Sequence, residues 1–264
     1  MSRLQQVMAA NAHKTLIPFI TAGHPKPELT VTTLHALVEQ GADVIELGIP
    51  FSDPMADGPT IQKSSERAIS QGVGLDDVLG FVTEFRKTNT QTPIVLMGYL
   101  NPIERMGYEK FVIQAQQAGV DAVLMVDSPP EESTDLLALL KARDMDQIYL
   151  VAPTTTEDRR KYILKNAGGF IYYVALKGVT GAADLDADAI QQEVAEVKKD
   201  TNLPVAVGFG VKDAATATAV ARNADAVVIG SALVEKLDAC ESAEDVTTCI
   251  ENFIAPIRMA LNSL

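Results

Sequence analysis

The 264-residue chain contains no tryptophan and only two cysteines, and aromatic residues make up just 5% of it. Because 47% of its residues are hydrophobic, the core must be built from Val, Ile, Leu and Ala, a composition that suits buried parallel strands. Cys240 and Cys249 stand outside any metal-type cluster, which indicates free thiols in a reducing compartment. An aromatic-rich core and a disulfide framework are therefore excluded.

Positive charge and long apolar runs are also scarce. A formal net charge of −13 would repel polyanions, and no stripe of Lys or Arg is present to neutralise the phosphates of a duplex. No run reaches the roughly 18 apolar residues of a membrane span, and residues 1–12 lack the apolar centre of a secretory signal. We expect a cytoplasmic protein that binds neither nucleic acid nor membrane.

Motifs for metals and common cofactors are missing as well. The three histidines, His13, His24 and His35, have no spacing of the HExxH kind, so no metal site is expected. No GxGxxG follows a strand, which argues against a dinucleotide site. Lys177 could be interpreted as a Schiff-base lysine, but its glycine neighbour favours a mobile loop over a desolvated pocket.

What the sequence does contain is an alternation of short, β-branched apolar runs with longer segments of helical period. This pattern is typical of βα units around a parallel sheet. The expected strands are Leu16–Thr21, Val44–Ile49, Ile94–Tyr99, Ala122–Val126, Ile148–Ala152, Phe170–Ala175, Val205–Val207 and Ala226–Ile229. Eight such units predict an α/β fold of the (β/α)8 TIM-barrel type, with an open doubly wound sheet as the alternative.

Boundary signals support this organisation. Pro129–Ser133 should open a leucine-rich helix and Asn166–Gly169 should close the next one. Leu4, Val7 and Met8 have helical spacing, which predicts a short helix covering the lower mouth of the barrel before the first strand. A quasi-repeat of Asp-ending turns precedes three strands, at Gly41–Asp43, Gly119–Asp121 and Asn223–Asp225. No linker divides the chain, so we expect one domain over residues 1–264.

Active sites of such barrels lie where the strands end, and Glu46 is the polar residue that stands out in the second strand. An ionised carboxylate is costly to bury, so its pKa should rise into a range where it can both give and take a proton. The alternative is a structural glutamate paired with a lysine across the barrel. Asp57, in the following proline-rich loop, is either a second functional acid or a turn-forming Asx residue.

Glycines gather after the late strands, at Gly178–Gly181, Gly208–Gly210 and Gly230, and Gly230 precedes a helix that opens near Ser231. Glycine lets backbone N–H groups approach a ligand, and a helix N-terminus offers unpaired donors with a favourable dipole. The loops after strands seven and eight are a frequent phosphate site in these barrels. Ordinary turn chemistry is the alternative, but the combination predicts a phosphate-binding cradle.

Several of these stretches resemble the alpha subunit of tryptophan synthase, in the family's order and over essentially the full chain. They are Pro18–Gly23, Glu46–Pro54, Ala56–Pro59, Tyr99–Pro102 and Gly178–Gly181. The resemblance implies retro-aldol cleavage of indole-3-glycerol phosphate to indole and glyceraldehyde 3-phosphate without metal or organic cofactor. In this family Glu46 would be the general acid/base, acting on indole C3 and on the glycerol hydroxyl. Asp57 would hydrogen-bond the indole N–H.

The resemblance also implies roles for other residues. Tyr172 would lie beside the glutamate, and the indole pocket would be walled by Phe19, Tyr99 and Phe209. The phosphate contacts would be Gly181, Gly210, Gly230 and Ser231. The stretch 177–185 would close over substrate, with Thr180 meeting Asp57.

Family membership further implies a pyridoxal phosphate-bearing beta subunit that receives indole, usually in an α2β2 complex. The loop Phe51–Pro59 and the region Asn101–Met106 would face it. The chain departs from the family pattern at His24, where Asp is usual, and at Ala175, where Ser is common. The first departure could alter partner contacts or loop dynamics, and neither removes a catalytic group.

Other functions remain open at this point. A stand-alone indole-releasing lyase would need the same residues, so the sequence separates it poorly from a channelling subunit. A non-catalytic barrel that binds a phosphorylated ligand and regulates a partner is disfavoured by the presence of both Glu46 and Asp57. A phosphosugar isomerase would need a further acid/base group where the other strand exits are apolar.

Overall fold

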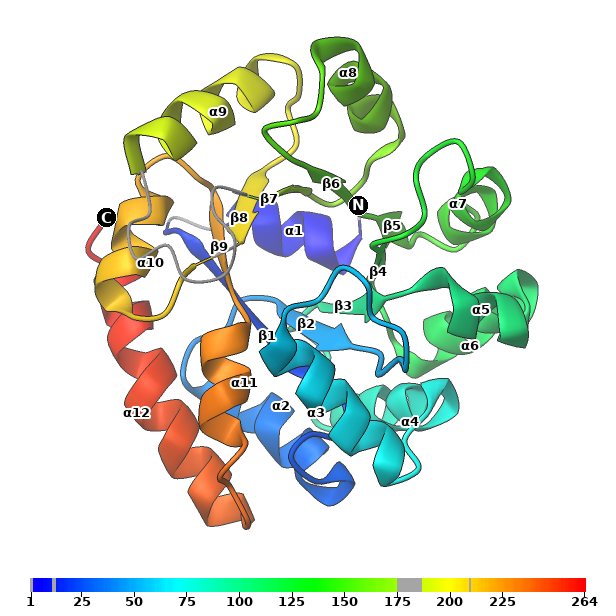
Figure 1. Ribbon diagram of the computed structural model, residues 1–264, viewed down its shortest axis with the longest axis vertical. Coiled ribbons are helices and arrows are strands. Elements are labelled where there is room, and N and C mark those ends of the chain that lie inside the picture. Colours follow the sequence, from blue (N-terminus) through cyan, green and yellow to red (C-terminus); the bar gives the residue numbers. More distant parts are fainter. Residues whose placement is uncertain (1, 11–12, 175–186, 209) are drawn as a thin grey trace.

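The computed structural model describes residues 2–10, 13–174, 187–208 and 210–264, with no side-chain description at 187–189. Strands and helices alternate around a barrel, with the helices outside (Figure 1). The strands are β1 Thr15–Thr21, β2 Ile45–Gly48, β3 Ile94–Gly98, β4 Ala122–Met125, β5 Asp146–Gln147, β6 Tyr149–Val151, β7 Ile171–Val174, β8 Val205–Gly208 and β9 Ala226–Ile229. The helices are α1 Arg3–Ala10, η1 Pro27–Leu29, α2 Thr30–Glu39, α3 Pro59–Ser70, α4 Leu75–Arg86, α5 Leu100–Met106, α6 Tyr108–Ala118, α7 Thr134–Lys141, α8 Glu157–Asn166, α9 Ala187–Lys199, α10 Ala214–Ala221, α11 Ser231–Leu237 and α12 Ala243–Leu261.

The strands form a nearly closed barrel, which confirms the predicted (β/α)8 fold over the open doubly wound sheet. All pairings between strands are parallel, in the order β5-β4-β3-β2-β1-β9-β8-β7-β6. Only Ile148 separates the two edge strands β5 and β6, and its N–H donates to the Val123 carbonyl at 2.9 Å. The expected fifth strand, Ile148–Ala152, corresponds to β6, which pairs with β7, whereas β5 lies just before the expected range and pairs with β4. The described residues therefore form nine strands.

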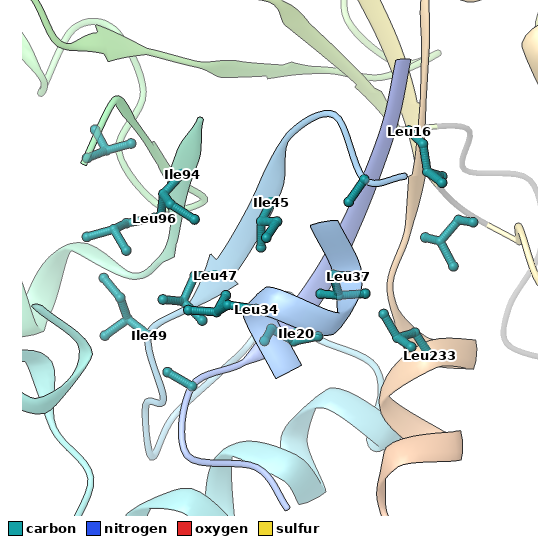
Figure 2. Close-up of a cluster of buried hydrophobic side chains, with 14 of the residues drawn as sticks. Leu16, Ile20, Leu34, Leu37, Ile45, Leu47, Ile49, Ile94, Leu96 and Leu233 are labelled. Atoms are coloured by element: carbon teal, nitrogen blue, oxygen red, sulfur yellow. The ribbon is translucent and has the colours of Figure 1, made fainter. Parts of the chain in front are cut away.

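Side chains alternate between an inner and an outer layer because successive residues of a strand face opposite sides. The inner layer includes Ile17, Val44, Val95 and Leu124, whose side chains meet inside the barrel. The outer layer packs against the surrounding helices, and Figure 2 shows the part of it between β1, β2, β3 and α2. Residues labelled there include Leu16, Ile20, Leu34, Leu37, Ile45, Leu47, Ile94 and Leu96.

Helix α1 covers the mouth at the N-terminal ends of the strands, as its spacing predicts. Leu4 is fully buried in the inner layer, and Val7 and Met8 pack against it. The Leu4 side chain also lies against Gly169, just before β7, where an added Cβ would come within 2.6 Å of Leu4 Cδ2. This end of the barrel is therefore plugged, and the opposite end is left for the strand exits.

The Asp-ending turns share one structural task at the plugged end. Each carboxylate accepts the backbone N–H at the start of the preceding strand of the chain and pairs with a cation. The sets are Asp43 with Leu16 (2.8 Å) and Arg258 (2.8 Å), Asp121 with Ile94 (2.8 Å) and Arg86 (2.9 Å), and Asp225 with Val205 (2.8 Å) and Lys198 (2.7 Å). The quasi-repeat therefore ties adjacent strands together.

Candidate active site

Glu46 faces the barrel interior because it alternates with Ile45 and Leu47 of β2, whose side chains point outward into the helix layer, while Val44, just before the strand, points inward. Its neighbours in register are Phe19 on β1 and Val95 on β3. The side chain is 0% exposed, and neither carboxyl oxygen has a hydrogen-bond partner within the described part of the chain.

Burial alone sets the protonation of this group. It raises the pKa of Glu46 from its usual 4.5 to about 8. No charge or hydrogen bond from a described residue offsets this, so the alternative of a glutamate paired with a lysine across the barrel is not supported. At neutral pH the carboxyl group is therefore mainly protonated, in balance with a minor ionised form. That is the state of a group that can donate a proton and take one back.

Tyr172 lies close to Glu46, as expected from the family resemblance. It occupies an inward position of β7, and its hydroxyl lies against Gly208, where an added Cβ would be only 2.1 Å from the oxygen. Burial, and then the negative charge of Glu46, raise the pKa of Tyr172 well above its ordinary value. Tyr172 is therefore a neutral phenol in the electrostatic field of the buried carboxyl group.

Asp57 is half-buried in the loop between β2 and α3. Burial raises the pKa of its carboxyl group, while a hydrogen bond from the Tyr99 hydroxyl acts in the opposite direction. The same hydroxyl accepts the backbone N–H of Ala56 at 3.0 Å, and the ring of Phe51 lies with its centroid 5.3 Å from that of Tyr99. Tyr99 therefore holds both the loop and its carboxylate.

A small, narrow pocket lies at the open mouth of the barrel, next to the inward face of β2. Phe19, Asp57 and Tyr99 line it, as does Gly48, the next inward residue of β2 after Glu46. Other lining residues went unpredicted: Thr21, Ile49, Ile61, Ser65, Met97, Gly98 and Val126. For Met97 the sequence held one clue: it lies two residues after Val95 on β3 and so faces the barrel interior. The other apolar residues at strand exits have the same composition as the core, so the sequence does not mark them as pocket residues. The site is an apolar slot with a carboxylate at its rim.

The predicted phosphate residues are only partly described. Gly230 caps the N-terminus of α11 and lies beside Phe19, whose Cβ would be 3.6 Å from an added Cβ. Ser231 begins the helix, and Gly210, with φ at +71°, follows β8. The first N–H groups of a helix have no intrahelical acceptor, so they are free to bind an anion. Gly230, at this helix N-terminus, therefore lies beside the cavity wall formed by Phe19.

Thr180, Gly181 and Phe209 lie outside the described residues, as do Ala175 and the stretch 177–185. Met55 is 80% exposed in the loop 51–59. Over the described residues, no group of three or more His, Cys, Asp or Glu side chains could hold a metal ion. In the same part of the chain, no helix is long and apolar enough to cross a membrane.

The fold and this site together define a (β/α)8-barrel protein with a buried carboxyl group near the exit of its second strand. The model of the family described as "Tryptophan synthase alpha chain" matches residues 4–261. The alpha chain of Janthinobacterium sp. (strain Marseille) is 56% identical over 265 residues, covering 99% of this chain and 100% of that one. That of Cupriavidus metallidurans is 57% identical, with full coverage of both chains.

Solved structures agree with these sequence relatives. Tryptophan synthase subunit alpha from Legionella pneumophila str. Paris superimposes with a TM-score of 0.93 at 42% identity, covering 100% of both chains. A tryptophan synthase structure from Mycobacterium tuberculosis gives 0.88 at 34% identity, covering 98% of each chain. The chain belongs to the tryptophan synthase alpha chain family.

Membership confirms the function expected from the resemblance. The chain is the alpha subunit of tryptophan synthase, a lyase component that acts in tryptophan biosynthesis. This family carries no cofactor of its own, because pyridoxal phosphate belongs to the beta subunit. The family also implies a beta-subunit partner.

Proposed function

We propose that Glu46 and Asp57 together carry the cleavage of indole-3-glycerol phosphate. The observation that carries this proposal is the fully buried, unpartnered carboxyl group of Glu46, whose pKa is about 8. It lies one inward position before Gly48, which lines the same cavity as Asp57. The pair thus combines a proton carrier in an apolar interior with an acid at the rim, and each has a separate task.

In the first step, protonated Glu46 donates its proton to C3 of the indole ring, and positive charge develops on the indole nitrogen. Asp57 stabilises that charge through a hydrogen bond from the indole N–H, and preorganised charge of this kind lowers the barrier. The Glu46 carboxylate then takes the proton of the adjacent glycerol hydroxyl. The carbon–carbon bond breaks, its electrons restore neutral indole, and the oxygen becomes the aldehyde of glyceraldehyde 3-phosphate. Glu46 ends the cycle protonated again.

The remaining residues bind the substrate. Phe19 and Tyr99, with Phe209, form walls of the indole pocket, and Tyr172 orients the Glu46 carboxyl group. Backbone donors at Gly210, Gly230 and Ser231, with Gly181, bind the phosphate, and Thr180 meets Asp57 when residues 177–185 close. This assignment is supported by the helix N-terminus beside Phe19, because such ends bind anions without a basic side chain.

We further propose a cytoplasmic α2β2 complex in which indole passes directly to the beta subunit. Its contact surface includes the loop Phe51–Pro59 and residues Asn101–Met106. Met55 in that loop is 80% exposed, so its apolar side chain is available for such a contact. A stand-alone lyase would instead turn over at full rate without the partner. Comparing turnover with and without beta subunit separates the two.

The acid/base proposal is tested by Glu46→Gln, which keeps the size of the side chain and removes its titrating proton. We expect indole release from indole-3-glycerol phosphate to fall at least a thousandfold, within the range attributed to acid/base groups of about 10²–10⁴. Substrate affinity, measured by calorimetry on the inactive variant, should stay within about threefold because Glu46 is not a phosphate contact. Undiminished turnover would favour a non-catalytic role for this carboxylate.

A further inference from the structure

His24 forms a buried polar contact that the catalytic steps above do not use. It lies between β1 and η1, is 3% exposed, and its Nε2 is 3.1 Å from Oδ1 of Asp238. Burial lowers the pKa of His24 to about 4, against the opposing influence of Asp238, so the ring is neutral at neutral pH. Because a carboxylate only accepts hydrogen bonds, Nε2 must carry the proton and donate it to Asp238.

The same carboxylate oxygen joins two helices to the β1 exit. Asp238 is the C-cap residue of α11, and Arg67 lies in the last turn of α3. Arg67 Nη1 donates to Oδ1 of Asp238 at 2.8 Å and to its carbonyl oxygen at 3.1 Å. Around this contact, Gln71 donates to the Pro25 carbonyl at 3.1 Å. The set His24, Arg67 and Asp238, here called the clamp, ties the C-terminal ends of α3 and α11 to one loop.

The opposite ends of these helices carry the two halves of the site. α3 begins at Pro59, two residues after Asp57, and α11 begins at Ser231. Both helices lie side by side next to β1 (Figure 1). Thr21 and Ser64, whose hydroxyls are 2.6 Å apart, fix α3 to β1 along the way. The angle between α3 and α11 therefore sets the distance from the Asp57 loop to the α11 N-terminus.

We propose that His24 is a positioning residue that acts through Asp238 and Arg67 to fix the span between the indole end and the phosphate end of the site. This rests on the proposed function, in which one substrate must reach both ends at once. A ligand that spans the site loses affinity when the distance between its two ends changes, whereas a fragment bound at one end does not. The clamp therefore favours the full-length phosphorylated substrate over a fragment that occupies only one end.

The test compares His24→Leu, His24→Gln and Asp238→Ala in the full chain. His24→Leu and Asp238→Ala should raise KM for indole-3-glycerol phosphate about tenfold, because loss of positioning costs affinity at both ends together. Inhibition constants for indole and for glycerol 3-phosphate, which each occupy one end, should change less than twofold. His24→Gln, whose amide can replace the Nε2 donor, should restore KM. The double variant His24→Leu with Asp238→Ala should be no worse than Asp238→Ala alone.

Arg160→Leu is the control, because it breaks a partly buried ion pair between α8 and Asp200 (2.6 Å), far from α3 and α11. It should leave the ratio of KM to the two inhibition constants unchanged. An unchanged KM in His24→Leu and Asp238→Ala, or a rise shared equally by both fragments, would overturn the positioning role. If the wild type releases no indole from indole-3-glycerol phosphate, the proposed function fails as well, so the two failures are distinguishable.

Discussion

The inward positions at β2 are Val44, just before the strand, and Glu46 and Gly48 within it, and of these only Glu46 titrates. Because no described side chain donates to Glu46, the surrounding apolar layer decides its protonation state. A single Lys or Arg in reach would instead favour the ionised form and remove the proton that the reaction needs. The absence of a partner within the described chain is thus a condition of the proposed chemistry.

This protonation also makes stability depend on pH. Between pH 4.5 and about 8 the unfolded chain loses the Glu46 proton while the folded chain retains it. The free energy of unfolding therefore falls as pH rises through that interval, at up to about 1.4 kcal/mol per pH unit. Gln does not titrate, so Glu46→Gln should gain roughly 3 kcal/mol relative to wild type between pH 5 and pH 8. Urea denaturation of both proteins at the two pH values measures this, and a pH-independent difference would contradict the raised pKa.

At the scale of elements, strand alternation places Glu46 and Gly48 on one face, and the close approach of β1 and β2 shapes the pocket. The Phe19 ring lies directly over Gly48, where an added Cβ would come within 2.7 Å of Phe19 Cζ. Glycine is therefore needed at position 48 so that the Phe19 ring can pack against the backbone and form a wall of the cavity.

Gly48→Ala should push the Phe19 ring into the cavity and lower kcat/KM for indole release about tenfold, since the ring defines the bound geometry. Gly80 in α4 is the control, because nothing lies within 4 Å of an added Cβ there. Gly80→Ala should keep full activity and stabilise the protein by about 0.5–1 kcal/mol, as expected inside a helix. Steady-state kinetics and thermal unfolding of both variants decide the matter. Full activity in Gly48→Ala would show that the ring is free to move.

Most of the strands and helices could be predicted from the sequence, because short apolar runs and helix-boundary residues depend on local structure. Glu46 was recognisable as one carboxylate in an apolar strand. The break at Ile148 was not, since it reflects a change of pairing partner between β4 and β7. Met97 and Val126 could not be told from core residues, because apolar lining and apolar core have the same composition. The His24–Asp238 contact joins positions 214 apart, which no local pattern reveals.

At the scale of the whole molecule, one nearly closed sheet contains β1 to β9, and contacts at its plugged end join distant parts of the chain. Arg258 of α12 binds Asp43 and the Lys14 carbonyl, so the last helix is tied to the first two strands. We propose that residues 1–264 form one cooperative domain. Removing a link between the two ends of the chain should therefore destabilise all of it together.

Arg258→Leu should lower the free energy of unfolding by about 3 kcal/mol, because it leaves the largely shielded Asp43 carboxylate without the buried Arg258 cation. Unfolding should remain a single transition, coincident when followed by tyrosine fluorescence and by far-ultraviolet circular dichroism. Lys87→Leu, which breaks an exposed pair with Glu84, is the control and should cost less than about 0.5 kcal/mol. Two separate transitions would argue against a single domain.

The most direct test of the central claim, that Glu46 acts from its protonated form, is the pH dependence of kcat/KM for indole release. If the reaction starts with proton donation to indole C3, kcat/KM should be level below a pKa of about 8 and fall tenfold per pH unit above it. The decline should be absent from the residual activity of Glu46→Gln. A wild-type rate that instead rises through pH 8 would mean that the ionised carboxylate is the active form and would contradict the mechanism.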